Sequence, residues 1–267
     1  MLILYFSGTG NTEYIARQIG QKMGAVCHSI EEKECDFAAE INAHDTIAVC
    51  YPIYGSRVPY IMRQFVVKHM EAFKGKKLVI FVTQIIFSGD GARALCDLFP
   101  DNHVNVIYAE HFFMSNNVCN VFVLRQTSRK KTRRLLQRAD KKMTMVCDNL
   151  HRGIHKRRGF STFSRLLGAM QGKLWQGDSR NAFVKKGTAE HKTKNGVKIS
   201  GDCTACGVCL DCPMDNLRIT NGIVETNNNC TGCYRCINCC PQRAISVMIK
   251  VRPKWQYARL GGESDKS

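Results

Sequence analysis

The first 113 residues alternate between short apolar runs and longer amphipathic stretches. The apolar runs predict strands at residues 1–7, 25–30, 46–51, 78–83 and 104–113. The amphipathic stretches predict helices at 12–23, 59–73, 91–99 and 127–150. The run at 78–83 is apolar without alternation, which is typical of a parallel sheet buried on both faces. The pattern therefore predicts an α/β fold with a five-stranded, doubly wound parallel sheet.

A further amphipathic helix is predicted in a basic bridge at 151–197, on the helical spacing of Phe160, Phe163, Leu167, Met170 and Leu174. Residues 125–200 hold 21 of the 39 lysines and arginines and four of the 22 acidic residues. The rest of the chain has 18 basic and 18 acidic residues, so the excess positive charge belongs to this segment. The favoured interpretation is a helix that packs one domain on another. The alternatives are docking on an acidic redox partner and lying on an anionic membrane surface. The domain boundary is expected within 185–198.

Nine of the fifteen cysteines lie in two blocks, each with three cysteines at x2 spacing followed by a Cys-Pro pair. Thiolates at this spacing are the ligand pattern of a pair of 4Fe–4S clusters, in which each Cys-Pro cysteine binds the cluster of the other block. A structural zinc site is the alternative, but it needs no Cys-Pro pair. We therefore assign one cluster to Cys203, Cys206, Cys209 and Cys240, and the other to Cys230, Cys233, Cys236 and Cys212.

The first block is one residue short, because only Leu210 and Asp211 separate Cys209 from Cys212. Cys212 remains the predicted fourth ligand, although its loop must turn more tightly. Cys239 is expected to be a buried thiol, with a substitute ligand as the alternative. The other cysteines show no metal-binding spacing and are expected to be ordinary free thiols: Cys27, Cys35, Cys50, Cys96, Cys119 and Cys147.

The first predicted strand leads directly into a helix through Ser7, Gly8, Thr9, Gly10, Asn11 and Thr12. Two glycines let the backbone fold around an anion, and the hydroxyls and the helix N-terminus supply donors, so we predict a phosphate site. The alternative is a polar helix cap. A nucleotide-hydrolysing P-loop is not expected, because it would carry a lysine here. Residues 89–94 match G-x-G-x-x-A, but they follow the fourth strand, which argues against a dinucleotide site.

The loop at 7–12 resembles the phosphate loop of flavodoxins, which bind FMN. The segments 51–59 and 83–91 also fit the flavin-holding loops of that family, at the carboxyl ends of the third and fourth strands. The resemblance implies FMN contacts from Pro52, Tyr54, Gly55, Phe87, Ser88 and Gly89. For Tyr54 and Phe87 the alternative is a loop aromatic that covers the core.

Together these motifs resemble a flavodoxin–ferredoxin fusion. The resemblance implies an FMN-binding domain at 1–150, the basic bridge at 151–197, a small α+β two-cluster ferredoxin domain at 198–251 and a tail at 252–267. It implies electron transfer between the clusters and FMN, with the protein as a carrier for redox partner enzymes. The alternative is an FMN-dependent oxidoreductase that acts on a small molecule and is fed by the clusters. Asp90 and Arg57 are the candidate acid–base residues for that alternative.

The expected partner is an acidic redox protein or reductase, because the excess charge is positive. Nucleic acid is not expected, since no binding module accompanies the charge. No apolar run reaches the length of a membrane span, although peripheral contact with a membrane stays open. The chain starts with a strand-like run and no signal-peptide pattern, which predicts the cytoplasm, and oxygen-sensitive clusters suggest an anaerobic host.

Overall fold

The computed structural model describes residues 1–87, 89–176, 196–227 and 229–259, with the backbone alone at 171–176. The chain divides into two compact units. The first comprises Met1–Ser7, Thr12–Met114 and Arg133–Ala189, and the second comprises Gly8–Asn11, Ser115–Thr132 and Glu190–Ser267. In the described residues, no helix has both the length and the apolar character needed to cross a bilayer.

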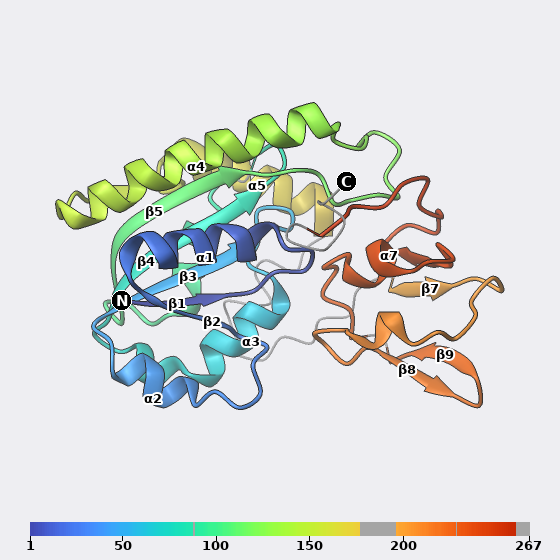
Figure 1. Cartoon of the computed structure of the whole chain (residues 1–267). Coiled ribbons are helices and arrows are strands. Elements are labelled where there is room, and N and C mark those ends of the chain that lie inside the picture. The colour runs from blue at the N-terminus through green and yellow to red at the C-terminus, as the bar shows by residue number, and fades with distance from the viewer. Residues whose placement is uncertain (88, 177–195, 228, 260–267) are drawn as a thin grey trace. The chain divides into compact units, whose positions relative to one another are not determined.

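The first unit is built on a parallel sheet of six strands in the order β2-β1-β3-β4-β5-β6 (Figure 1). The strands are β1 (Leu2–Tyr5), β2 (Val26–Ser29), β3 (Thr46–Pro52), β4 (Lys77–Gln84), β5 (Asn105–Phe113) and β6 (Lys156–Arg157). The central strands are almost wholly buried, as their continuous apolar runs require. The α/β fold with a parallel sheet is confirmed. The count of five strands is wrong, because the two residues of β6 pair with Tyr108 and Ala109 of β5.

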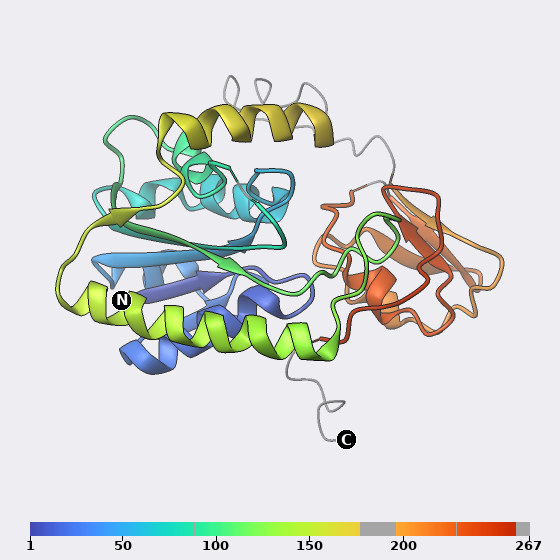
Figure 2. The same ribbon diagram turned by 90° about the horizontal axis from the view of Figure 1, so that it is seen from above.

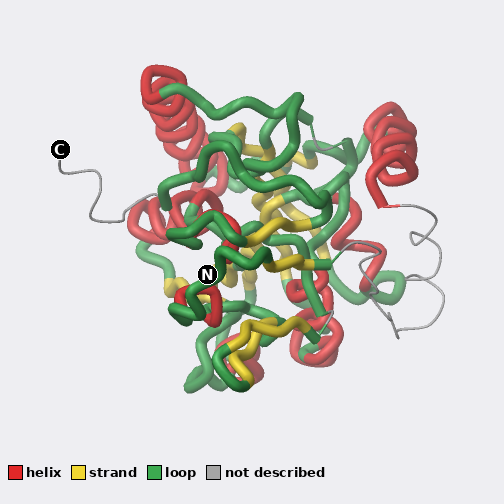
Figure 3. The backbone as a smooth tube through the Cα atoms, turned by 90° about the vertical axis from the view of Figure 1, so that its right-hand side faces the viewer, coloured by secondary structure: helices red, strands yellow, loops and turns green. Residues whose placement is uncertain are grey.

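Helices cover both faces of this sheet (Figures 2 and 3). On one face lie α1 (Asn11–Met23) and α4 (Arg129–His151), where the Tyr14 hydroxyl donates to Asp140 Oδ1 at 2.6 Å. On the other lie α3 (Tyr60–Lys68) and α5 (Thr162–Gln176). The short α2 (Phe37–Asn42) packs against α3 through the rings of Phe37 and Phe65, whose centroids are 4.9 Å apart. The remaining helical turns are 3-10: η1 (Met70–Phe73) and η2 (Arg93–Leu98).

The second unit is a small α+β assembly. Its two antiparallel pairs join β7 (Val197–Ile199) to β10 (Ile245–Val247) and β8 (Leu217–Thr220) to β9 (Ile223–Thr226). Asn221 and Gly222, both at positive φ, form the two-residue turn of the second pair. The 3-10 turn η3 (Val208–Leu210) and the helix α7 (Arg235–Cys239) complete the unit.

The segment Ser115–Thr132 is held in the second unit by side-chain amides. Asn120 Nδ2 donates to the Val247 carbonyl at 2.8 Å, and Asn238 Nδ2 donates to the Asn117 carbonyl at 2.9 Å. The core of this unit is small, and several of its buried residues are cysteines. A unit of this kind has little apolar area with which to stabilise itself.

Candidate functional site

The eight cysteines with metal-binding spacing lie at two hollows of the second unit. One hollow is lined by Cys212, Cys230, Cys233 and Cys236. The other is lined by Cys203, Cys206, Cys209 and Cys240. Each hollow is thus lined by three cysteines of one block and the Cys-Pro cysteine of the other. Four soft thiolate donors around one space are the donor set of a 4Fe–4S cluster, so the residues present fit that group.

The two cysteine blocks contain different kinds of helical turn, which explains how Cys212 reaches its hollow although the first block is one residue short. In the second block the chain between Cys236 and Cys240 runs through the α-helix α7. In the first block it runs through the 3-10 turn η3, which starts after Gly207 at a φ of 80°. A 3-10 turn has fewer residues per turn than an α-helix, so it can accommodate the missing residue.

Burial raises the pKa of several of these thiols. The pKa of Cys233 is raised to about 12, chiefly by burial, and that of Cys236 lies well above its usual value for the same reason. A bound metal would hold such cysteines as thiolates, because ligation replaces the proton. Two backbone amides already point at sulfur: Gly232 N–H donates to Cys230 Sγ and Ala244 N–H to Cys240 Sγ, both at 3.3 Å. Hydrogen bonds of this kind set the reduction potential of a cluster.

Cys239 lines neither hollow. Its thiol lies 3.4 Å from the carbonyl oxygen of Cys236 and 3.7 Å from that of Val208. It is half-buried rather than fully buried, and it lies next in sequence to the ligand candidate Cys240. Cys239 is therefore a natural control for experiments on the eight lining cysteines.

The turn Gly8–Asn11 belongs to the second unit. Gly8 and Thr9 are buried residues, and their backbone N–H groups donate to no acceptor among the described residues. Buried backbone donors almost always have a partner, so these two N–H groups call for an added acceptor. They lie just before the N-terminus of α1, where the helix dipole favours an anion. The residues present therefore fit a phosphate.

Protein groups already fix the rest of this turn. Asn117 Nδ2 donates to Thr9 Oγ1 at 2.8 Å, and the Tyr257 hydroxyl donates to Asn11 Oδ1 at 2.7 Å. A Cβ at Gly8 would lie 2.5 Å from the carbonyl oxygen of Cys233, so only glycine fits there. Arg235 Nε also donates to the Gly8 carbonyl at 3.1 Å. Sequence analysis did not foresee this close approach, because the residues are more than 200 positions apart.

The remaining candidates for flavin contact lie in the first unit. Thr12 Oγ1 lies 2.7 Å from Thr83 Oγ1, and both side chains are buried, as is Ser7. Tyr54 and Arg57 exchange two backbone hydrogen bonds of 3.2 Å across Gly55 and Ser56, which both have positive φ. This is a two-residue reverse turn that directly follows β3 and Pro52. After β4, Phe87 is 43% exposed and Gly89 has a φ of 53°, while Ser88 lies outside the described residues.

The loop after β4 is held by contacts that sequence analysis missed. A Cβ at Gly168 of α5 would clash with Asp90 Oδ1, and a Cβ at Gly89 would lie 2.7 Å from the Gly168 backbone. The Asp90 carboxylate is buried and accepts bonds from Arg93 Nε at 3.1 Å and Nη2 at 2.9 Å. On α5, Phe163, Leu166 and Met170 are exposed, Leu167 is half-buried, and the side chain of Leu174 lies outside the described residues. Phe160 is half-buried and precedes the helix, which begins at Thr162.

A family model described as "Flavodoxin domain" matches residues 2–145. Similar solved structures include the two-electron reduced flavodoxin of Megasphaera elsdenii (22% identity, TM-score 0.37), which covers 53% of this chain and 99% of its own. Oxidised Flavodoxin 2 of Bacillus cereus has 17% identity, a TM-score of 0.35 and coverages of 54% and 97%. A flavoprotein of Lactobacillus acidophilus in complex with FMN has 16% identity, a TM-score of 0.35 and coverages of 41% and 91%. No curated protein matches the sequence.

Proposed function

The chain belongs to the flavodoxin family through residues 2–145, and on this premise we propose that it is an electron carrier with FMN and two 4Fe–4S clusters. The observation that favours the clusters is the sorting of eight cysteines into two hollows of four. The clusters supply single electrons and FMN accepts one or two, so their combination can couple one-electron and two-electron traffic. The protein must then bind these groups, orient them and tune their potentials.

We assign FMN to the loop Ser7–Thr12. The N–H groups of Gly8 and Thr9 would bind its phosphate, and the hydroxyl of Thr12 would orient it. The backbone at Gly55 and Gly89 would hold the ring, and Phe87 would add one exposed aromatic side chain. Pro52 would direct the chain from β3 into that turn, because its ring fixes φ.

Two contacts link the FMN loop to the cysteine blocks inside the second unit. Cys233 packs directly on Gly8, and Arg235 donates to the Gly8 carbonyl. A ligand candidate of one cluster therefore contacts the backbone that would bind the flavin phosphate. This short connection supports direct electron exchange between the two groups.

Iron, sulfide and flavin should be measured per chain after anaerobic purification and reconstitution. We expect about eight iron, about eight sulfide and about one FMN. Cys212→Ser should leave about four iron, because it removes one ligand from a single cluster. The matched control Cys239→Ser should keep about eight. Zinc in place of iron, no flavin, or equal iron in the two variants would contradict the proposal or its ligand assignment.

The buried state of Asp90 favours a carrier over an enzyme that acts on a small molecule. Asp90 is one of the two candidate acid–base residues, but its side chain is 1% exposed and its carboxylate is held by Arg93. Arg57 is also buried, at 6% exposed. Neither side chain is placed to exchange protons with a substrate from solvent. The flavin of a carrier should therefore react with outer-sphere acceptors and show no saturable turnover of an organic substrate.

We propose an acidic redox partner that docks on the first turns of α4. This helix begins with Arg129, Lys130, Lys131, Arg133 and Arg134, all exposed, and no acidic residue lies in its first turn. Cations at a helix N-terminus are unfavourable against the dipole, so their presence indicates a function other than helix stability. An acidic surface would relieve this repulsion on binding.

Electron transfer to two small complexes tests this surface. Iron(III)–EDTA is an anion and hexaammineruthenium(III) is a cation. Rising salt should slow reduction of the first and speed reduction of the second. Arg133→Glu with Arg134→Glu should weaken both trends, while the exposed control pair Lys68→Glu with Lys74→Glu, of equal charge change, should leave them nearly intact. Equal effects of the two pairs would show that net charge alone matters and would overturn the α4 assignment.

A further inference from the structure

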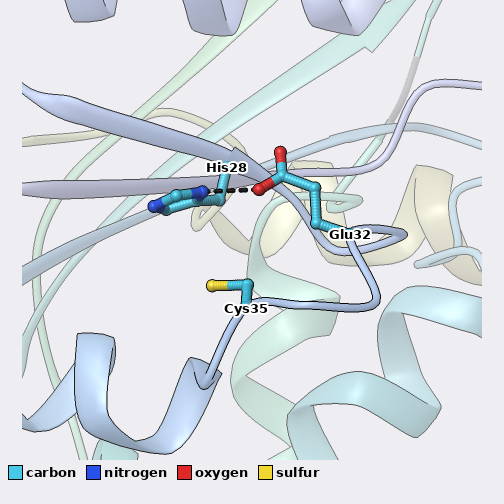
Figure 4. A group of neighbouring side chains, drawn as sticks. All are labelled: His28, Glu32 and Cys35. Atoms are coloured by element: carbon cyan, nitrogen blue, oxygen red, sulfur yellow. Dashed lines mark hydrogen bonds and ion pairs between the residues drawn. The ribbon is translucent and has the colours of Figure 1, made fainter.

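Three side chains with different metal-binding atoms converge in the first unit (Figure 4). His28 lies on β2, Glu32 lies in the turn after it, and Cys35 lies just before α2. One nitrogen, one carboxylate oxygen and one sulfur of the three residues lie within 4.8 Å of one another. Each residue is at least partly open to solvent, so an ion can reach the group. From its sequence context Cys35 is expected to be an ordinary thiol, although the chain contains the spacing His28-x3-Glu32-x2-Cys35.

Separate hydrogen bonds fix each of the three residues. His28 pairs with Leu4 of β1 in the parallel ladder. Glu32 Oε1 accepts from Ser29 N–H at 2.8 Å, which leaves Oε2 at 2.6 Å from His28 Nδ1. Cys35 is fixed from the other side, because its carbonyl accepts from Phe37 N–H at 3.1 Å and the next residue, Asp36, caps α2. Ligands held by their own backbone contacts lose little freedom when an ion binds.

The local charge also favours a cation, in contrast to the basic chain as a whole. The segment 31–40 has a single lysine among five carboxylates: Glu31, Glu32, Glu34, Asp36 and Glu40. Burial and the charges of Glu32, Glu40 and Asp36 raise the pKa of Cys35. A bound divalent ion would offset the negative charge of the carboxylates and stabilise the thiolate, and so would lower the pKa of Cys35.

A surface ion pair explains less of this arrangement. His28 and Glu32 are spaced i, i+4, and their side chains are 26% and 41% exposed, so the pair alone contributes little stability. It also gives no reason for a thiol beside the pair. We propose that His28, Glu32 and Cys35 bind one divalent ion of the zinc class, with water at the fourth position. Mixed nitrogen, oxygen and sulfur ligands suit Zn²⁺, which is borderline-soft.

Binding requires small rearrangements and proton transfers. Tetrahedral zinc, with bonds of about 2.0–2.3 Å, places its ligand atoms roughly 3.5 Å apart, so the Cys35 side chain must move inward. The ion takes the place of the hydrogen bond between His28 Nδ1 and Glu32 Oε2. It binds the neutral imidazole in the tautomer that carries its proton at Nε2, and any proton at Nδ1 passes to water. The Cys35 thiol releases its proton to water. This site is independent of the flavin and the clusters proposed above.

Zinc binding to the anaerobically reconstituted full chain tests the site. Equilibrium dialysis against ZnSO₄ with metal analysis should give about one zinc per chain beyond the iron. Cys35→Ser and His28→Gln should weaken binding at least tenfold. The controls are Cys147→Ser, a buried thiol of α4, and Glu31→Gln, a neighbouring carboxylate outside the trio. Cys147→Ser should bind zinc as the wild type does, and Glu31→Gln should weaken binding far less than the changes at Cys35 and His28.

X-ray absorption at the zinc edge gives a readout that does not depend on affinity. We expect one sulfur at about 2.3 Å with nitrogen and oxygen neighbours at about 2.0–2.1 Å. Four sulfur neighbours would show zinc in the cysteine blocks and would overturn the proposal. Equal zinc binding by the wild type and Cys35→Ser, or no binding by the wild type at micromolar zinc, would also overturn it.

Discussion

At the scale of single residues, Gly168 shows how a helix position can require the absence of a side chain. Alanine usually stabilises a helix interior relative to glycine by about 1 kcal/mol. At Gly168 a Cβ would meet the buried carboxylate of Asp90, which Arg93 holds in place. We therefore expect Gly168→Ala to lower the free energy of unfolding by about 1–3 kcal/mol.

Gly20 in α1 is the matched control for this change. A Cβ there would meet nothing closer than Cys27 Cβ at 3.4 Å, which is an ordinary contact. Gly20→Ala should therefore raise stability by up to about 1 kcal/mol. Urea unfolding followed by circular dichroism compares the two variants. Stabilisation by both alanines would show that α5 does not need glycine at this contact.

His111 gives the first unit a pH dependence. Burial, with the charge of Arg158 next, lowers its pKa from 6.5 to about 4, so the folded state holds it neutral. Between these values the unfolded chain binds more protons than the folded chain. Its contribution to stability is thus present above about pH 6.5 and is lost as pH falls toward 4. From pH 7 to pH 5 the loss should be about 2 kcal/mol, and His111→Gln should flatten this slope in urea titrations.

At the scale of elements, Glu110 explains the sixth strand. This carboxylate of β5 is fully buried and contacts Lys142 of α4 at 3.1 Å, Lys156 of β6 at 2.9 Å and Arg158 at 3.3 Å. Burial alone would raise its pKa, but the His111 N–H and the lysines outweigh burial and leave it at about 2. One carboxylate therefore ties α4 and β6 to the sheet.

Replacing this carboxylate should loosen both elements. Glu110→Gln leaves two lysines and an arginine without their anion, and losing one partner of a buried pair costs about 3–5 kcal/mol. The partly exposed cations can turn to solvent, so we expect the lower end of that range. Hydrogen exchange should show faster exchange in β6 and at the contacting part of α4. Exposed Glu71→Gln is the control and should change stability by less than about 0.5 kcal/mol.

The same element shows what sequence can and cannot predict. The predicted bounds of β1 to β5 are each within two residues of those observed, because continuous apolar runs encode buried strands directly. Strand β6 consists of Lys156 and Arg157, so it has no apolar signal and depends on a distant glutamate. Helix α2 is six residues long, too short to show a helical period.

At the scale of the whole molecule, local spacing predicts a site only where the site is local. The spacing of the cysteines predicts two groups of four. In the structure the same two groups each line one hollow. The approach of Cys233 to Gly8 joins segments from opposite ends of the chain, and no sequence pattern encodes it. Likewise the turn Gly8–Asn11 lies in the second unit, although it follows the first strand of the first unit.

The two units should differ in their dependence on metal. The first has a six-stranded sheet with a large apolar core. The second has short strands and a core in which Cys209, Cys230, Cys236 and Cys240 take the place of apolar side chains. Four thiols around each hollow contribute little stability by themselves, whereas metal ligation adds its binding free energy to folding.

If the cysteines bind the clusters proposed above, removing iron should unfold the second unit and leave the first folded. After anaerobic treatment with a chelator, amide protection should fall by at least tenfold in β7, β8, β9 and β10 and persist in β1, β3 and β4. Cys212→Ser, which disturbs one hollow, should produce part of the same loss, and Cys239→Ser should produce none. Protection that survives chelation in β7–β10 would show that the apolar core holds this unit without metal. Loss of protection in β3 and β4 as well would show that the two units fold as one.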